Sequence, residues 1–203
     1  MTETTSPKPA NLDPKDIPDY LLSMSITFSD PSIWRSLQVP GSITLASLHH
    51  IIQISMGWED VDTHQFLVGK IFYQQGAGIN RPGGGKGQYS EDHYALYQLE
   101  DGMKFIFTYL YDGGEGWEIQ LKLEDILYGK ERRDTPCLIQ GERAAPPEAV
   151  RDIHQYQALF DGDELDQLKF IQLTGRESNH HFNPEHVDRE QINQQLASLA
   201  KGF

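Results

Sequence analysis

Cysteine is almost absent from the sequence, since Cys137 is the only one in 203 residues. A single thiol cannot form a disulfide within the chain, which argues against a disulfide-stabilised secreted fold. The first twenty residues lack the apolar core of a signal peptide, and no apolar run approaches the roughly 20 residues that span a bilayer. We therefore expect a cytoplasmic protein without a membrane segment.

Basic residues are also scarce, because 17 Lys and Arg stand against 30 Asp and Glu and give a formal net charge of −13. Such a charge repels a polyanion such as DNA unless the basic side chains cluster. The densest basic stretch, residues 130–133, contains an acidic residue and is followed directly by Asp134. Nucleic acid is therefore a disfavoured partner, and a protein or a small-molecule ligand is the expected one.

The pattern of apolar residues divides the chain into two regions. Residues 1–17 are rich in Thr, Pro and Lys and have no apolar periodicity, so we expect a flexible N-terminal tail. Residues 18–203 contain strand-like and helix-like patterns and are expected to form a single domain.

The first elements of this domain have clear periodicities. Apolar and polar residues alternate over 20–28 and over 33–39, and the turn residues between them favour an antiparallel hairpin. Between Thr44, a capping residue, and Gly57, a helix-ending one, the apolar spacing predicts an amphipathic helix. His64 to Tyr73 is expected to be a strand. Residues 76–88 follow, and because six of these thirteen are glycine we expect a mobile loop.

The second half of the chain begins with strand patterns and ends with helical ones. The strand patterns occur at 94–99, 104–111 and 117–124. The last two are separated by only five residues, 112–116, so we expect a tight hairpin within a three-stranded meander. Helical patterns occur at 147–160, 163–174 and 188–200. This order predicts an α+β fold, in which an antiparallel sheet, made of the N-terminal hairpin and the meander, is packed by one early helix and C-terminal helices.

Several short motifs occur in order along the chain: Ser29–Arg35 (SDPSIWR), Met56–Trp58 (MGW), His64–Phe66 (HQF), Tyr111–Glu118 (YDGGEGWE) and Pro146–Glu148 (PPE). Together they resemble the Ri-plasmid ORF-three-like family, whose members are also described as transposon passenger proteins of the TnpR type. The resemblance runs from about Tyr20 to Leu199. It implies a protein associated with plasmids and mobile elements, and it assigns no activity to particular residues.

The chain departs from the family pattern at a few positions. Ile119, Ala145 and Val150 stand where the family usually has His or Cys. This implies that a metal site built on those side chains is absent here, and we expect neither a bound metal nor a cofactor.

Two groups of polar residues could meet in the fold and form a cation site or an acid–base pair. They are Asp60, Asp62 and His64 before and at the start of a strand, and Asp112, Glu115 and Glu118 at the hairpin. Acidic residues also populate solvated turns, so these residues could equally be solvated turn residues without a site. His64 is the best candidate for a proton carrier, because the pKa of histidine ordinarily lies nearest neutrality.

Other patterns favour structural roles. The glycine-rich loop lacks the spacing of a P-loop, and the histidines at 180, 181 and 186 lack the spacing of a structural metal site. His49 lies on the apolar stripe of its helix and is expected to be a hydrogen-bonded core residue. Trp58 and Trp117 are first of all packing residues, although they could also wall a ligand pocket.

The leading hypothesis is a protein of unknown biochemical function that serves as a non-enzymatic binding or accessory domain. Its ligand-binding edge is predicted to comprise Trp58, His64, Trp117 and Glu118. The first alternative is a metal-assisted hydrolytic enzyme in which His64 acts with the hairpin carboxylates. The second is a resolvase-like accessory protein in DNA transactions, which would require a basic face that the net charge disfavours.

Overall fold

The computed structural model describes residues 12–76, 88–104, 106–112, 116–133, 135–162, 164–175 and 182–200. Most of the expected tail (residues 1–11) and most of the expected glycine-rich loop (residues 77–87) lie outside these ranges. Residues 14–16 form a turn, and Arg132 donates a hydrogen bond of 2.7 Å to the carbonyl of Lys15.

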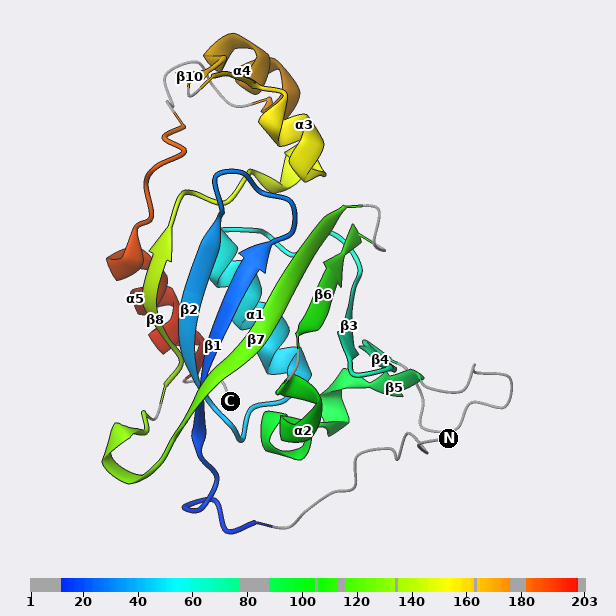
Figure 1. Cartoon of the computed structure of the whole chain (residues 1–203), viewed down its shortest axis with the longest axis vertical. Coiled ribbons are helices and arrows are strands. Elements are labelled where there is room, and N and C mark those ends of the chain that lie inside the picture. Colours follow the sequence, from blue (N-terminus) through cyan, green and yellow to red (C-terminus); the bar gives the residue numbers. More distant parts are fainter. Residues whose placement is uncertain are drawn as a thin grey trace.

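One large sheet organises the described chain (Figure 1). Its strands are β1 (Asp19–Ile26), β2 (Trp34–Pro40), β3 (His64–Val68), β4 (Ile71–Gln74), β5 (Gln88–Ser90), β6 (Phe107–Tyr111), β7 (Trp117–Leu127) and β8 (Cys137–Glu142). Their spatial order is β5-β4-β3-β6-β7-β1-β2-β8, and neighbouring strands are antiparallel except for the parallel pair β4–β5. The helices are α1 (Leu45–Met56), α2 (Glu100–Met103), α3 (Ile153–Gln157), α4 (Gln167–Thr174) and α5 (Arg189–Leu199).

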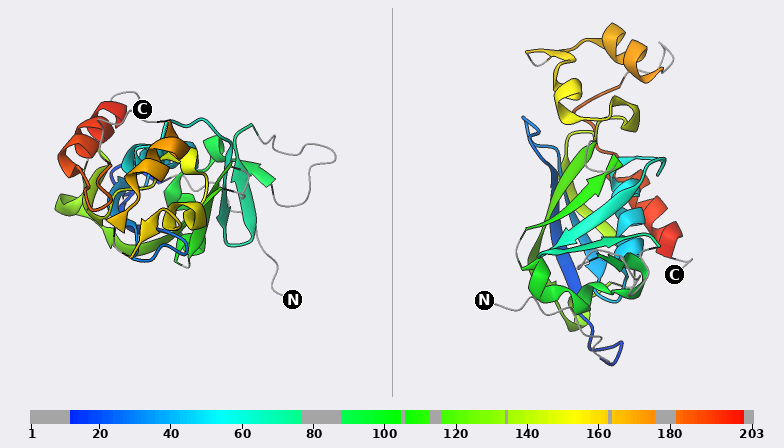
Figure 2. Two further views of the ribbon diagram at one scale, coloured as in Figure 1. Left: turned by 90° about the horizontal axis from the view of Figure 1, so that it is seen from above. Right: turned by 90° about the vertical axis from the view of Figure 1, so that its right-hand side faces the viewer.

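The two longest helices, α1 and α5, lie on the same side of the sheet, as the side view in Figure 2 shows. A small lobe made of α3, α4 and the short strands β9 (Phe160–Asp161) and β10 (Glu164–Leu165) projects beyond one end of the sheet (Figure 1). Within the described ranges, no helix combines the length and the apolarity that a bilayer crossing requires.

The alternation of residue types explains why α1 and α5 cover one face of the sheet. In β7, Trp117, Ile119 and Leu121 are buried, whereas Glu118 and Lys122, which point to the other face, are exposed. Side chains of successive strand residues point to opposite faces, so the apolar set lies under α1 and the charged set faces solvent.

Local signals fix the limits of α1. The Thr44 side chain accepts a hydrogen bond from the Ser47 amide, and Gly57 ends the helix in the left-handed conformation with φ of 70°. The buried stripe of the helix is Leu45, Leu48, Ile51, Ile52 and Met56, at the spacing that the sequence predicts. Three polar residues of α1, His49, Gln53 and Ser55, are also buried.

The predicted α+β class is confirmed: the described chain has a large, mostly antiparallel sheet and a few helices. The expected N-terminal hairpin is the pair β1–β2, with Tyr20 opposite Val39.

The prediction of a strand at residues 94–99 is wrong. Ala95 makes only an isolated bridge to Thr44, and the chain then forms a 3₁₀ helix, η2 (Leu96–Gln98), that leads into α2. The buried residues Leu96, Leu99 and Met103 follow one another at intervals of three and four, a helical spacing that overrides the short alternation before them. The predicted meander therefore reduces to β6 and β7, and the other neighbour of β6 is β3.

Candidate functional site

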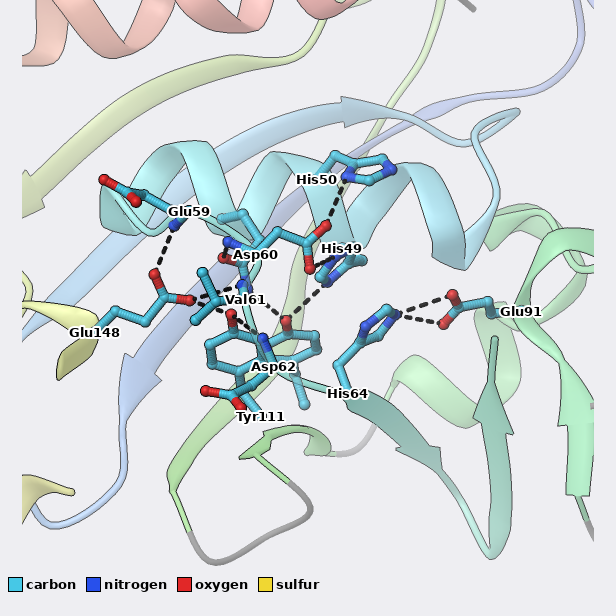
Figure 3. A network of polar contacts seen from close by, with 12 residues as sticks. His49, His50, Glu59, Asp60, Val61, Asp62, His64, Glu91, Tyr111 and Glu148 are labelled. Carbon is cyan, nitrogen blue, oxygen red and sulfur yellow. Dashed lines mark hydrogen bonds and ion pairs between the residues drawn. The ribbon is translucent and has the colours of Figure 1, made fainter. Parts of the chain in front are cut away.

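Two histidines, one on α1 and one on β3, meet on the helix-covered side of the sheet (Figure 3). His49 of α1 stacks on His64, the first residue of β3, with ring centroids 3.5 Å apart and planes 3° apart. Each ring has a carboxylate beside it. His49 Nε2 lies 2.9 Å from Asp60 Oδ1, and His64 Nε2 lies 3.0 and 2.9 Å from the two oxygens of Glu91.

The position of Asp60 follows from the way the chain leaves α1. Asp60 has φ of 58°, a left-handed conformation that Asp adopts more readily than most residues. Its backbone N–H donates a hydrogen bond of 3.1 Å to Gln53 Oε1. The chain therefore folds back over the helix, and the Asp60 carboxylate reaches the histidines.

The orientation of the Gln53 amide determines which ring nitrogen of His49 carries the proton. Because Gln53 Oε1 accepts from Asp60, its Nε2 is the donor to Tyr109 Oη at 2.8 Å. The Tyr109 proton is then available to His49 Nδ1, which lies 2.8 Å from the same oxygen. This network assigns the proton of neutral His49 to Nε2, next to Asp60.

Burial controls the ionisation of this inner group. The pKa of His49 is lowered to about 4, chiefly by burial and also by the nearby His64, while Asp60 opposes the shift. Burial also raises the pKa of Tyr109 far above its usual range. At neutral pH, therefore, His49 is an uncharged imidazole and Tyr109 an uncharged phenol.

Glu148 holds the segment that carries Asp60. Its carboxylate accepts the backbone N–H groups of Glu59 at 2.7 Å and Val61 at 3.3 Å, and it accepts the hydroxyl proton of Tyr111. The Asp62 amide in turn donates to Tyr111 Oη at 3.1 Å. Glu148 thus fixes the backbone on both sides of Asp60, as Figure 3 shows.

A cavity of about 730 Å³ opens beside the two histidines, between α1, residues 60–65, the end of β4 and the 3₁₀ helix η1 (Glu91–His93). Its described lining contains three histidines and four carboxylates and has no lysine or arginine. His50, the neighbour of His49, is half exposed at its mouth, with Nδ1 3.8 Å from Asp60 Oδ2. The arrangement is suited to holding a cation or a ligand with a positively charged group.

The residues singled out from the sequence have different locations. His64 lines the cavity. Trp58 and Trp117 are buried and stack on each other with ring centroids 5.6 Å apart, and Trp58 Nε1 donates to the carbonyl of Pro146. Glu118 is exposed on the opposite face of the sheet from Trp117, where it accepts a hydrogen bond from Thr27.

The hairpin carboxylates are not the ones that contact His64 in the described chain. Asp112 forms an ion pair of 3.5 Å with Arg151. Glu115 lies outside the described residues, as do His180 and His181, while His186 is exposed. The carboxylate on His64 belongs to Glu91.

Sequence reasoning missed Glu91, Glu148 and the role of His49 at the cavity. His49 is the buried, hydrogen-bonded residue that its position predicted, but it also reaches the cavity wall. A signal was available: His49 and Gln53 are polar residues four apart on an apolar helical stripe, a pair that needs polar partners. Glu91 and Glu148 had no such signal, because their contacts join residues 27 and 37 positions apart.

Comparison with known proteins places these residues in a family context. The model of the plasmid pRiA4b ORF-3-like protein family matches residues 19–191, a range that includes every site residue described above. "Uncharacterized protein y4hQ" of Sinorhizobium fredii (strain NBRC 101917 / NGR234) is 28% identical over 137 residues, which are 67% of this chain and 68% of that protein.

Among solved structures, the crystal structure of MM3350, a protein of unknown function from Methanosarcina mazei Go1, has the same fold with a TM-score of 0.71. It is 28% identical in sequence, and the match covers 88% of this chain and 98% of that one. The names of these relatives state no activity. The family resemblance seen in the short motifs is confirmed.

Proposed function

The chain belongs to the plasmid pRiA4b ORF-3-like protein family, and on that premise we propose that it is a binding domain that holds a positively charged ligand in the cavity beside His64. The observation that carries this proposal is the composition of the cavity wall, with four carboxylates, three histidines and no lysine or arginine among the described lining residues. A recess lined by one sign of charge concentrates counter-ions and ligands of the opposite sign.

The contacts of the four carboxylates in the cavity wall support the same function. Glu91 is buried and contacts His64, whereas Asp60, Asp62 and Asp92 have no lysine or arginine within the described lining. These three carboxylates are the groups that a ligand cation would meet. Glutamine side chains at the end of β4 add hydrogen-bonding groups for a polar ligand.

Binding is favoured over chemistry by the ionisation of the inner histidine. A general base works best when its pKa lies near the operating pH, and burial lowers the pKa of His49 to about 4. The Glu148 contacts that hold the backbone around Asp60 also suit a preformed binding site.

The test is a titration of ¹⁵N-labelled protein with spermidine and with L-arginine methyl ester, with citrate and glucose as anionic and neutral comparisons. We expect amide shifts confined to residues 60–65 and 91–92 with the two cationic probes only. Asp62→Asn should weaken binding about fivefold or more, while Asp125→Asn, an exposed acid on β7, should not. Equal shifts with citrate, or no shift with either cation at millimolar concentration, would contradict the proposal.

A second candidate, hydrolysis with His64 as proton carrier, is favoured by one contact. Glu91 engages Nε2 of His64 through both oxygens, and within the described residues Nδ1 makes no hydrogen bond. A carboxylate that fixes one ring nitrogen leaves the other free to accept a proton. The check is hydrolysis of p-nitrophenyl acetate and bis(p-nitrophenyl) phosphate by the wild type and by His64→Gln, since equal rates would exclude this role.

A further inference from the structure

Three potential metal ligands converge at the mouth of the cavity. His49 and His50 are consecutive on α1, with ring centroids 4.9 Å apart and a tilt of 56°. Asp60 returns to both of them, with Oδ1 2.9 Å from His49 Nε2 and Oδ2 3.8 Å from His50 Nδ1. One ligand atom from each residue lies within 4.8 Å of the other two.

The two shortest of these separations bracket the ligand–ligand distance around a tetrahedral ion. Zinc binds imidazole nitrogen and carboxylate oxygen at about 2.0–2.2 Å, so two ligands at the tetrahedral angle are about 3.3 Å apart. The observed distances of 2.9 and 3.8 Å lie on either side of that value. One ligand atom from each residue lies within 4.8 Å of the other two, so closing all three onto one ion requires side-chain movements of up to about 1.5 Å.

A second observation concerns His49 alone. Its side chain is 3% exposed, and Nε2 is buried and makes no hydrogen bond, although Asp60 Oδ1 is only 2.9 Å away. Asp60 Oδ1 therefore lies away from the direction in which His49 Nε2 would form a hydrogen bond. Two ligands of one ion can have this relation, and a buried polar atom that makes no hydrogen bond is uncommon in folded proteins.

From this geometry we propose that His49, His50 and Asp60 bind a divalent transition-metal ion, with Zn²⁺ as the best fit, and leave a fourth coordination position open to the cavity. The inference rests on the proposed function, because it names the cation that the same cavity would hold. Two imidazoles and one carboxylate suit zinc, whereas calcium and magnesium take oxygen ligands. Three protein ligands with one open position are typical of zinc sites that accept a further ligand.

The residues behind His49 support this role. Tyr109 Oη and Gln53 orient the imidazole through its other nitrogen, as hydrogen bonds to the far side of a ligating histidine usually do. An imidazole binds a metal ion in its neutral form, through the nitrogen that carries no proton. For zinc to bind Nε2, the proton on this nitrogen has to move to Nδ1, where it is donated to Tyr109 Oη. The hydrogen bond that Tyr109 donates to His49 Nδ1 is then lost.

Calorimetric titration with ZnCl₂ tests the proposal on the full chain, prepared without a histidine tag and treated with EDTA. We expect one ion per chain for the wild type. His50→Gln and Asp60→Asn should each lower the affinity roughly tenfold or more, and His186→Gln, an exposed histidine elsewhere, should leave it unchanged. Circular dichroism of each variant verifies that it is folded.

The tautomer of His49 gives a second, independent measurement. Its ¹⁵N ring shifts should report the proton on Nε2 without zinc and on Nδ1 with one equivalent of zinc. The proposal is overturned if no zinc binds at 100 µM, or if His50→Gln and Asp60→Asn bind it as tightly as the wild type. Spermidine binding without zinc binding would reject the metal site alone, and the loss of both would reject the proposed function as well.

Discussion

His49 lies face to face with His64, at a ring-centroid distance of 3.5 Å and an interplanar angle of 3°. Two imidazolium ions at that separation would repel each other by about 5 kcal/mol, taking an effective dielectric constant of 20. The stack therefore tolerates one positive charge and not two. Since burial keeps His49 neutral at neutral pH, the stack avoids this repulsion.

The first prediction concerns the pH dependence of stability. The pKa of His49 is about 4 in the folded protein, against about 6.5 for an unfolded histidine, so the unfolded chain binds the extra proton between these values. The stability that neutral His49 provides is present above pH 6.5 and is lost as the pH falls toward 4. The slope from this one group is at most about 1.4 kcal/mol per pH unit.

Urea unfolding of the wild type and of His49→Gln between pH 4.5 and 7.5 measures this slope. The variant should lose less stability than the wild type on acidification. His186→Gln, which alters an exposed histidine, should follow the wild type. Parallel curves for His49→Gln and the wild type would mean that His49 titrates normally in the folded state.

The second prediction concerns Glu148. Its carboxylate accepts two backbone N–H groups, from Glu59 and Val61, and the hydroxyl of Tyr111. Glu148→Ala leaves these donors without an acceptor, so we expect a loss of about 1–3 kcal/mol in the free energy of unfolding. Hydrogen exchange should locate the effect, because the amides of Glu59 and Val61 should lose protection.

Glu124→Ala is the matched control for that experiment. Glu124 is an exposed glutamate that also accepts a side-chain hydrogen bond, from Ser23, and its replacement should cost less than about 1 kcal/mol. If Glu148→Ala proves no more costly than Glu124→Ala, the Glu148 contacts do not hold the segment around Asp60.

The parts of the fold that the sequence predicted are those with a local cause. The alternation in β7 and the cap at Thr44 act over a few residues, and both are found where they were expected. The strand prediction for residues 94–99 failed because a strand periodicity and a helical periodicity compete there. Contacts with residues 43–45 favour an isolated bridge followed by a helical turn. Such long-range contacts leave no mark in a short window of sequence.

The candidate site was predictable only in part for the same reason. His64 was recognised from its chemistry and does line the cavity. Its carboxylate partner, Glu91, depends on the path of the chain through β4 and β5, which no spacing rule fixes. Asp60 was considered only as a turn or cation residue near His64, whereas its contact with His49 depends on a left-handed backbone conformation.

The third prediction concerns Arg35, a buried guanidinium that is 2% exposed. It donates to the carbonyls of Ser55 on α1 and of Trp34, Glu142 and Arg143 around the ends of β2 and β8. Burial lowers the pKa of Arg35 to about 10, so the side chain stays charged at neutral pH. Arg35→Met removes the donors to four carbonyls and should lower the free energy of unfolding by about 3 kcal/mol or more.

Thermal and urea unfolding measure this loss. Arg35→Lys, which keeps the charge but lacks the planar fork, should fall between Arg35→Met and the wild type. Arg151→Met replaces an exposed arginine and should change stability by less than about 1 kcal/mol. A nearly neutral Arg35→Met would show that water satisfies these carbonyls as well as the guanidinium does.

The last prediction separates packing from ligand binding at Trp58. Trp58 stacks on Tyr111 and Trp117 and donates from Nε1 to the carbonyl of Pro146, but it is not part of the cavity wall. Trp58→Phe should therefore cost about 1–3 kcal/mol of stability and leave spermidine binding unchanged. Trp34→Phe, in which a half-buried indole loses a bond to the exposed Glu142, should cost less. Unchanged stability together with lost spermidine binding would instead place Trp58 in the ligand site, as the sequence hypothesis proposed.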